Sequence, residues 1–573
     1  MNWHSFMKHL HAIVLALILC KMHKYEAAPV GQNYVIIIDA GSSGSRMFVY
    51  TWQSKAESIS GLEDVEILKN SQGKPVVQKR TPGLSSFADK LDEIPKYISS
   101  LLDVAVENIP TSALPNTPLF IMATAGMRLL SPTQQDMIWQ TVRDHVKSHY
   151  RFDFKYSDAY TISGTEEGLF GWISVNYLLG RFRPVSKTKE IIKQPTDGML
   201  DMGGASMQIA FEIESTENLP KELVSEFSVR GKWFSPEQNY KVYVTSYLGY
   251  GMNALRKRYE EFLLYLYIGR HGIQTKKLEI EDPCLLRGFN VQNDRVPHAP
   301  ALNVPPEPTN ETFTVTYKGT GNMTQCLKNV EPLLLLNNHC TPIPCAMNNV
   351  VQPQIDFNSL EFYGLSEFFY TLETLKMIPP VKYSYHEALS KAQEICNTNW
   401  DAYHADLRKE KPDLSEEKFE SFVSFKKLIC FKASYLLSAL HKGLHFPENY
   451  EKLQPAHEIN STELQWSLGA LLYKLKTSTP EAEHNRKILL AFVIISGVVF
   501  GLTLLGVILY FIFKKRCSRT PKSLQVSNQQ IDPVDTTNIP STDVHLANSK
   551  DTNNTNNNKI NNNNTDFHNN DTR

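Results

Sequence analysis

Cysteine is scarce in this sequence, with eight in 573 residues. A small fold held mainly by disulfides is therefore excluded, and no Cys-x-x-Cys or His-Glu-x-x-His spacing indicates a zinc site. An excess of one charge is also lacking, because 59 basic and 60 acidic side chains give a net charge of −1. Nucleic acid is thus not expected as a partner. No Gly-x-x-x-x-Gly-Lys-Ser/Thr loop occurs, which excludes that phosphate-binding motif.

One long hydrophobic run is present, at 488–513. Its 26 residues carry no charge, and as a helix they would span about 39 Å, more than the roughly 30 Å of a bilayer core. We predict a transmembrane helix. Lys514, Lys515 and Arg516 follow it, which indicates that 514–573 is cytosolic. This tail has 11 asparagines in its last 23 residues and is predicted to be disordered.

The first 28 residues contain a shorter apolar run, His11 to Cys20. Residues 26–28 fit a cleavage site poorly, so we interpret 1–28 as an uncleaved signal anchor, with a cleaved signal peptide as the alternative. Residues 29–487 would then lie in a lumen or outside the cell. Three glycan acceptor sequons in this stretch agree, at Asn310, Asn322 and Asn460.

Six of the eight cysteines lie in the same stretch, and an even number suits disulfides in an oxidising compartment. Six cysteines allow fifteen pairings, and six reduced core cysteines are the alternative. Neighbourhood in the sequence favours the pairs Cys284–Cys326, Cys340–Cys345 and Cys396–Cys430.

A unit of strand, Asp-containing glycine loop and strand occurs twice. The first has Asp39 before Gly41-Ser42-Ser43-Gly44, and the second has Asp201 before Gly203-Gly204-Ala205-Ser206. The two aspartates are 162 positions apart (201 − 39), so each unit is expected to open its own domain. The predicted division is domain I at 29–162, domain II at 163–462 and a return segment at 463–487.

Helical spacing of apolar residues predicts several helices. One begins at Ser131 and Pro132, and a second, amphipathic helix carries Leu169 to Tyr177 after a first turn with Glu166 and Glu167. Residues 357–376 and 385–400 are also predicted to be helical.

The two loops suit phosphate binding, because glycine and serine let backbone N–H groups converge on an anion. One such loop alone is more often a plain turn. Asp39 and Asp201 end buried strands, where a carboxylate is costly unless a cation such as Mg²⁺ or Ca²⁺ neutralises it. Glu166 and Glu167 can be interpreted in two ways. They could simply interact favourably with the helix dipole, or one of them could deprotonate an attacking water. Thr124, at the end of a third strand, is a candidate to hold that water or is simply part of a turn.

Five segments resemble the apyrase regions of the nucleoside triphosphate diphosphohydrolases, in the order of that family. They are IIIDAGSSGSR, IMATAGMR, ISGTEEGLFGWISVNYLLG, LDMGGASMQIAF and FYGLSEFFY. The pattern is most similar to the intracellular, Golgi and endolysosomal branch. The resemblance implies an α/β fold in which two ribonuclease H-like domains, of the actin, sugar kinase and heat-shock chaperone type, surround a nucleotide cleft.

The same resemblance implies a role for each motif residue. Glu167 would be the catalytic base, and Thr124 and Gln208 would position the water. Asp39 and Asp201 would hold Mg²⁺ or Ca²⁺ through water, and Tyr370 would stack on the nucleotide base. The phosphates would be lined by Ser42, Ser43, Gly44, Gly203, Gly204, Ala205 and Ser206. Two departures leave the base preference open: Gly44 replaces a histidine of several surface members, and Phe425-Lys426-Lys427 lacks the arginine that completes their base clamp.

These features predict a membrane-anchored, cation-dependent hydrolase of nucleoside tri- and diphosphates that releases orthophosphate by direct attack of water. Golgi or endolysosomal membrane is favoured, with the cell surface as the alternative. The expected partners are the nucleotides and membrane lipid, through one or two spans, while self-association as a homo-oligomer is left open. The alternative function is a receptor-like membrane protein that binds nucleotide without hydrolysing it, and the glutamate favours the enzyme.

Overall fold

The computed structural model describes residues 32–53, 65–183, 185–187, 190–229, 238–299, 311–336, 345–477, 496–497 and 501–515. Two units are present, one up to Arg486 and the other from Lys487 onward, and each is described by itself. The first unit contains both glycine loops and all five motif segments.

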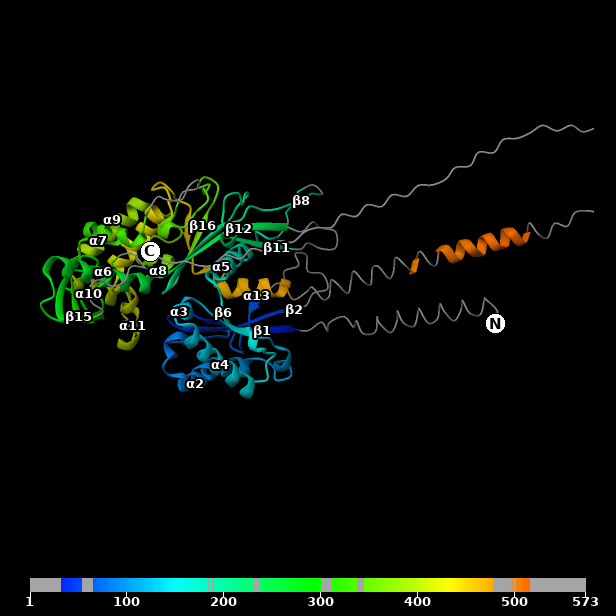
Figure 1. Cartoon of the computed structure of the whole chain (residues 1–573), viewed down its shortest axis with the longest axis horizontal. Helices are drawn as coiled ribbons and strands as arrows, with labels where there is room; N and C mark the ends of the chain where they lie inside the picture. Colours follow the sequence, from blue (N-terminus) through cyan, green and yellow to red (C-terminus); the bar gives the residue numbers. More distant parts are fainter. Residues whose placement is uncertain are drawn as a thin grey trace, which may run out of the picture. The chain divides into compact units, whose positions relative to one another are not determined.

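The first sheet comprises β1 Gln32–Ala40, β2 Ser45–Gln53, β3 Glu66–Ile67, β4 Val77–Arg80, β5 Leu119–Ala123 and β6 Ala159–Thr161. Its order is β3-β2-β1-β5-β6, with β4 also paired to β2 (Figure 1). β1 and β2 form an antiparallel hairpin, and β5 and β6 run parallel to β1. Helices α2 Ile94–Asn108 and α4 Pro132–His149 pack on one face, through buried residues such as Leu101 and Val142.

The second sheet repeats this arrangement with β9 Gly198–Met202, β10 Ser206–Glu212, β11 Val224–Val229, β12 Gln238–Leu248, β16 Phe362–Ser366 and β17 Leu453–Pro455. Its order is β11-β12-β10-β9-β16-β17. β9 and β10 form the antiparallel hairpin, and β16 and β17 continue parallel to β9. Two sheets that each join a hairpin to parallel strands confirm the predicted pair of ribonuclease H-like, actin-type α/β domains.

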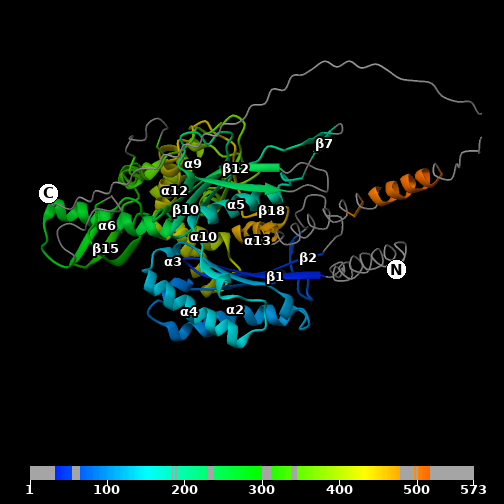
Figure 2. The same cartoon turned by 45° about the vertical axis from the view of Figure 1, so that its right-hand side comes forward.

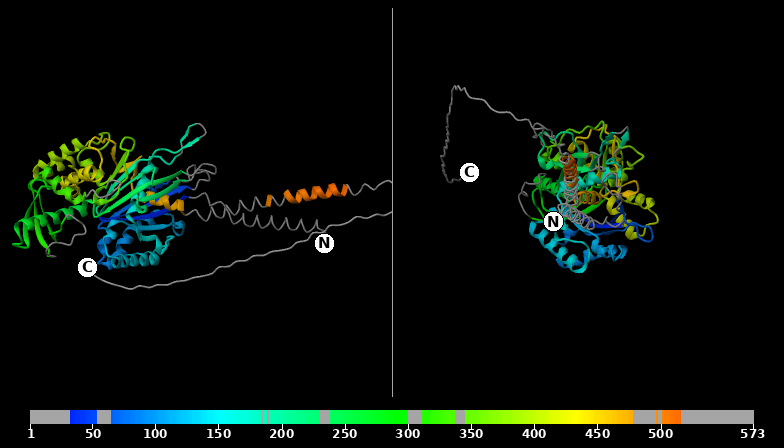
Figure 3. Two further views of the ribbon diagram at one scale, coloured as in Figure 1. Left: turned by 45° about the horizontal axis from the view of Figure 1, so that its top comes forward. Right: turned by 90° about the vertical axis from the view of Figure 1, so that its right-hand side faces the viewer.

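Two helices lie between the sheets, α5 Gly164–Leu178 and α13 Trp466–Thr477 (Figures 1 and 2). They share one apolar core with Ile37 of the first sheet and Met199 of the second. The prediction of an amphipathic helix at α5 is wrong, since every residue from Glu167 to Asn176 is buried. Both sheets and α13 cover α5, so it has no wide polar face. The two views in Figure 3 keep the blue first domain and the green second domain on opposite sides of this layer.

The other face of the second sheet is covered by α6 Met252–His271, α8 Glu367–Thr374, α9 Tyr385–Asn397 and α12 Ile429–Ser438. A three-stranded sheet, β13 Lys277–Asp282, β14 Asn290–Arg295 and β15 Phe313–Gly319, lies beside them. The prediction of one helix at 357–376 is wrong, because 362–366 is strand β16. Pairing with β9 overrides the helical spacing there. The helix predicted at 385–400 ends at Asn397, and a new helix, α10 Trp400–Glu410, starts after the cap Asn399.

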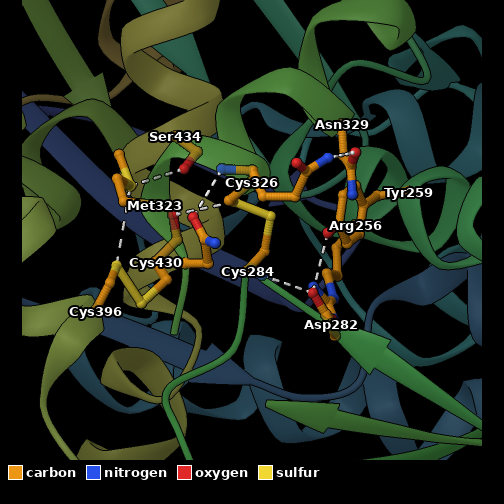
Figure 4. Close-up of a disulfide and its surroundings, with 12 residues drawn as sticks. Arg256, Tyr259, Asp282, Cys284, Met323, Cys326, Asn329, Cys396, Cys430 and Ser434 are labelled. Atoms are coloured by element: carbon orange, nitrogen blue, oxygen red, sulfur yellow. Dashed lines mark hydrogen bonds and ion pairs between the residues drawn. A yellow bond between two sulfur atoms is a disulfide. The ribbon is translucent and has the colours of Figure 1, made fainter. Parts of the chain in front are cut away.

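Two disulfides lie near each other in this outer region (Figure 4). They join Cys284 to Cys326 and Cys396 to Cys430, the pairs that sequence neighbourhood favours. Cys345 is disulfide-bonded as well, and its expected partner Cys340 lies outside the described residues. Beside Cys284, the buried Arg256 guanidinium contacts the carboxylates of Asp282 at 2.6 Å and Glu260 at 2.8 Å. The network neutralises charges that burial would otherwise make costly.

Within the described ranges, no helix is both long and apolar enough to cross a membrane. The predicted span at 488–513 is described only at 496–497 and 501–513, and the latter part is helical with exposed apolar side chains such as Leu502 and Phe513. That helix continues to Lys515, two residues into the predicted tail. The remainder of the span, the signal anchor at 1–28 and residues 516–573 lie outside the described residues.

Candidate active site

The two glycine loops face each other. Loop 1, residues 41–44, joins β1 to β2, and loop 2, residues 203–205, joins β9 to β10. A Cβ atom on Gly204 would lie 2.8 Å from Ser42 Oγ and from Ser43 Oγ, so the two loops come close together here. Asn253, in the first turn of α6, donates from Nδ2 to Ser43 Oγ at 3.4 Å. Loops separated by about 160 residues therefore line one site, as a polyphosphate clamp requires.

The amino terminus of α6 supports loop 2. The backbone N–H of Met252 donates to Gly203 O at 2.9 Å, and those of Asn253 and Ala254 donate to Gly204 O at 2.9 and 3.0 Å. These bonds satisfy helix N–H groups that otherwise have no partner. They direct the positive end of the helix dipole at the loop, which favours an anion there.

Asp39 and Asp201 sit at the starts of the two loops. Each has an Oδ1 atom that is buried and has no hydrogen-bond partner among the described residues. Burial raises the pKa of Asp39, the charge of Arg46 lowers it and the nearby Asp201 carboxylate raises it, and the result is a pKa of about 7. Burial also raises the pKa of Asp201, against a hydrogen bond from Ser366 and the charge of Arg46. Two close, under-neutralised carboxylates fit a divalent cation between them.

Asp39 and Asp201 suit a cation that they would hold through water molecules. Across the described part of the chain, no group of three or more His, Cys, Asp or Glu side chains is arranged to ligate a metal directly. Hard cations such as Mg²⁺ retain several waters and need only one or two carboxylates with substrate phosphates. Asp39 and Asp201 match that donor set.

Three neighbours of these carboxylates were not found by sequence reasoning. Arg46 lies opposite Asp39 in the hairpin and donates from Nη1 to Gln465 Oε1 at 3.2 Å. Trp466, the first residue of α13, lowers the pKa of Asp39 against the effect of burial, and Ser366 does the same for Asp201. Arg46 and Ser366 lie inside the motif segments, which is the only sequence signal that singled them out.

Glu167 lies at the centre of a buried polar network, with 9% of its surface exposed. Its Oε2 accepts from Arg128 Nη2 at 2.8 Å and from Gln208 Nε2 at 3.1 Å. Gln208 Nε2 also lies 2.7 Å from Ser206 Oγ, and Arg128 Nη2 lies 3.2 Å from the same Oγ. The expected base, the expected water-positioning glutamine and phosphate loop 2 are therefore directly connected.

Glu166 and Glu167 have different environments. Glu166 accepts the Ser163 N–H at 2.8 Å, while Ser163 Oγ accepts the Glu166 N–H at 3.1 Å, which is a capping box at the start of α5. Glu167 instead points to Arg128 and Gln208. Glu166 therefore caps the helix, and Glu167 is the carboxylate that is available for chemistry.

Electrostatics prepares Glu167 to take up a proton. Burial raises its pKa to about 7, the Arg128 charge and hydrogen bond lower it, and the carboxylates of Asp201 and Asp39 raise it. A base with a pKa near the working pH combines adequate ionisation with adequate basicity.

Thr124 and Tyr370 lie on elements next to the site. Thr124 is buried directly after β5, and its N–H donates to Ala40 O at 3.2 Å, beside loop 1. It precedes α3 Ala125–Arg128, so the same short helix presents Arg128 to Glu167. Tyr370 is on α8 with 42% of its surface exposed. Burial of the rest of the side chain raises its pKa, and the charge of Arg46 partly offsets that rise. Its exposed ring suits stacking on a planar ligand.

Two of the three glycan acceptor sequons, those at Asn322 and Asn460, lie in the part of the chain that the structure describes. Asn322 is exposed and its side chain caps α7 Met323–Val330 by accepting the Gln325 N–H at 3.0 Å. Asn460 is exposed between β18 Glu458–Ile459 and β19 Thr462–Glu463, and its amide donates to Leu178 O at 2.9 Å. Asn310 lies outside the described residues.

Arg128 is the functional candidate that sequence reasoning missed most clearly, and it predicts a shift in pH dependence. Arg128→Met would leave Glu167 buried without its cation, so the pKa of Glu167 should rise further. We expect a pH–rate profile displaced toward alkaline pH, with about a tenfold loss of rate at pH 7 for each unit of displacement. Arg143→Met is the control, since Arg143 bonds Ala159 O in the same domain. An unshifted profile for Arg128→Met would contradict the pairing.

The raised carboxyl pKa values also predict how stability depends on pH. Asp39 and Glu167 have pKa values of about 7 in the folded chain, against ordinary values of 3.8 and 4.5. A group with a raised folded pKa stabilises fully at low pH, and that contribution is lost as the pH rises through the folded pKa. We expect the melting temperature in EDTA to fall between about pH 4.5 and pH 7. Asp39→Asn should flatten this decline, and a flat wild-type curve would contradict the prediction.

Comparison with known proteins identifies the family of this chain. The family model described as GDA1/CD39 (nucleoside phosphatase) matches residues 26–488. Human ectonucleoside triphosphate diphosphohydrolase 4 is 32% identical, covering 86% of this chain and 82% of its own length. Nucleoside-triphosphatase ntp-1 of Caenorhabditis elegans is 34% identical, and the alignment covers 78% of this chain and 73% of that protein.

A solved structure supports the fold. The crystal structure of nucleoside triphosphate hydrolases from Neospora caninum superposes with a TM-score of 0.53 at 15% identity, covering 83% of this chain and 97% of that one. Among the relatives are also ectonucleoside triphosphate diphosphohydrolases 7, as in Xenopus tropicalis, 32% identical over 85% of this chain and 82% of that one. The chain therefore belongs to the GDA1/CD39 (nucleoside phosphatase) family.

Proposed function

We propose that this protein hydrolyses nucleoside tri- and diphosphates to lower phosphates and orthophosphate, with Mg²⁺ or Ca²⁺ as cofactor. The observation that carries the proposal is the buried Glu167, held by Arg128 and Gln208 beside two facing phosphate loops. Relatives named as a nucleoside-triphosphatase and a nucleoside-diphosphatase support the substrate class.

Binding would use both halves of the cleft. Loop 1 supplies Ser42, Ser43 and Gly44 to the phosphates. Loop 2 supplies Gly203, Gly204 and Ala205, and the first residue of β10 supplies Ser206. Backbone N–H groups and hydroxyls in such loops are donors for phosphate oxygens. Tyr370 offers its exposed ring to the nucleotide base.

Asp39 and Asp201 would hold the divalent cation through water, and the bound cation would neutralise negative charge on the phosphates. Glu167 accepts a proton from water while the water oxygen bonds to the terminal phosphorus. The bond from that phosphorus to the bridging oxygen breaks, and the leaving nucleotide keeps the bridging oxygen and its electron pair. Gln208 and Thr124 position the water, and no phosphorylated side chain is required.

The compartment belongs to the same proposal. A span at 488–513 would anchor the enzyme in membrane lipid, with residues 29–487 in a lumen or outside the cell. The disulfides Cys284–Cys326 and Cys396–Cys430 suit an oxidising compartment, and the exposed Asn322 and Asn460 could carry glycans. The similarity of the motif segments to the intracellular branch of the family favours a Golgi or endolysosomal membrane.

The direct test is phosphate release by the purified full-length chain in detergent, with ATP, ADP, UDP, GDP and CTP offered separately. We expect orthophosphate and the next lower nucleotide, dependent on Mg²⁺ or Ca²⁺. Saturable nucleotide binding without phosphate release for any substrate would contradict hydrolysis and support the receptor-like alternative.

A further inference from the structure

Ser246 of β12 lies directly opposite Gln208 of β10 in the antiparallel register. Paired residues direct their side chains to the same face of a sheet. Gln208 Nε2 donates to Ser246 Oγ at 3.0 Å, and the serine is half-buried. Ser246 lies outside the five motif segments, yet it directly contacts the residue that is expected to position the water.

The side-chain nitrogen of Gln208 has three oxygen neighbours among the described residues. Besides Ser246 Oγ, they are Ser206 Oγ at 2.7 Å and Glu167 Oε2 at 3.1 Å. An amide nitrogen only donates, through two protons, whereas the amide oxygen only accepts. If the amide were turned around, its oxygen would face the Glu167 carboxylate, and two acceptors repel each other. These contacts therefore fix the nitrogen toward Glu167 and turn the carbonyl oxygen, Oε1, away from it.

The first turn of α5, which carries Glu167, packs against Ser246. A Cβ atom on Gly164, the first residue of α5, would overlap Ser246 Oγ, and one on Gly168 would lie 2.6 Å from Val244 Cγ1. The two glycines are four positions apart and share one side of the helix, as Val244 and Ser246 share one face of β12. The close approach of α5 to β12 thus places Ser246 beside both Gln208 and the helix of the expected base.

We infer that Ser246 is a positioning residue, which holds the Gln208 amide in the orientation that the attacking water needs. The attacking water has two protons, and Glu167 accepts only one of them. With its nitrogen held by Ser246 and Ser206, Gln208 offers Oε1 as the hydrogen-bond acceptor for the other. Both water protons are then engaged, and a lone pair of the water is directed at the phosphorus. This role rests on the proposed function, because it assumes that Gln208 positions the water.

Ser246→Ala removes the hydroxyl and leaves the phosphate loops unchanged. We expect the rate of phosphate release at saturating nucleotide to fall roughly three- to tenfold, as for the loss of one hydrogen bond between neutral groups. KM and the affinity for a non-hydrolysable ATP analogue should stay near those of the wild type. The full-length chain in detergent would be used, and its melting temperature would show that the variant is folded.

A double-mutant cycle tests whether Ser246 acts through Gln208. Gln208→Met keeps the length of the side chain and removes the amide, so it should lower the rate more than Ser246→Ala does. In the double variant, Ser246→Ala should cause no further loss, because there is no amide left to orient. A merely structural serine would lower the rate by the same factor in both backgrounds.

Thr245→Val is the matched control on the same strand. Thr245 is buried and lies opposite Ile209, so its side chain points to the other face of the sheet. Valine keeps the shape of threonine and removes its hydroxyl. The rate and KM of this variant should equal those of the wild type, whatever the change in melting temperature.

The outcomes distinguish the inference from the proposed function. A wild-type chain that releases no phosphate would overturn the proposed function and the inference together. An active wild type with an equally active Gln208→Met variant would overturn the water-positioning role of Gln208, and with it the inference. A slow Gln208→Met variant together with an unchanged rate for Ser246→Ala would overturn the inference alone, and so would a double variant in which the two losses multiply.

Discussion

Glu167→Gln is expected to lower the rate of phosphate release by roughly a hundred- to ten-thousand-fold, the range for loss of a general base. The amide keeps the size of the side chain but cannot accept the proton of the attacking water. Nucleotide affinity should stay near that of the wild type, because the phosphate loops are unchanged. Single-turnover rates and equilibrium binding of a non-hydrolysable analogue would measure the two quantities separately.

Glu166→Gln is the matched control one residue earlier. Glutamine also completes a capping box with Ser163, so helix α5 should start normally and the rate should change little. If the two glutamate variants lost activity equally, or if Glu167→Gln lost binding together with turnover, Glu167 would not be the base.

Asp201→Asn is expected to abolish metal-dependent turnover while the fold persists. The amide is nearly isosteric with the carboxylate, and the neutral group removes an unfavourable buried charge. EDTA should have the same effect on the wild type, and either Mg²⁺ or Ca²⁺ should restore it, since hard oxygen ligands acting through water accept both ions. Phosphate release and melting temperature would be followed over a metal titration.

Asp197→Asn provides the comparison for that variant. Asp197 directly precedes β9, the strand that holds Asp201, and is buried, but it pairs with Arg181 Nε at 2.8 Å, away from the loops. Its replacement should lower the melting temperature by breaking the ion pair and leave the Mg²⁺ requirement unchanged. Full activity of Asp201→Asn, or undiminished wild-type turnover in EDTA, would refute the role of Asp201.

Short sequence patterns correctly predicted the structural elements that are determined mainly by residues close to each other in the chain. The hairpins around Asp39 and Asp201 follow from branched apolar runs on either side of glycine loops, and Ser131 caps α4 as its sequence indicates. The motif resemblance added the order of the site residues, including the preference for Glu167 over Glu166.

Elements whose state depends on distant partners were predicted less well. Residues 362–366 have helical spacing but form β16, because β9, about 160 residues earlier, offers an unpaired edge. Helix α5 follows its predicted position, yet its burial on all sides required knowledge of both sheets and of α13.

The amino-acid sequence by itself determined which residues can bind phosphate, hold a cation and accept a proton. Tertiary structure alone decided which of them meet. Arg128 reaches Glu167 across 39 positions, Gln208 reaches it across 41, and Trp466 comes near Asp39 from the other end of the domain pair. No local periodicity encodes such contacts, because they arise only when the sheets and α13 pack around a common core.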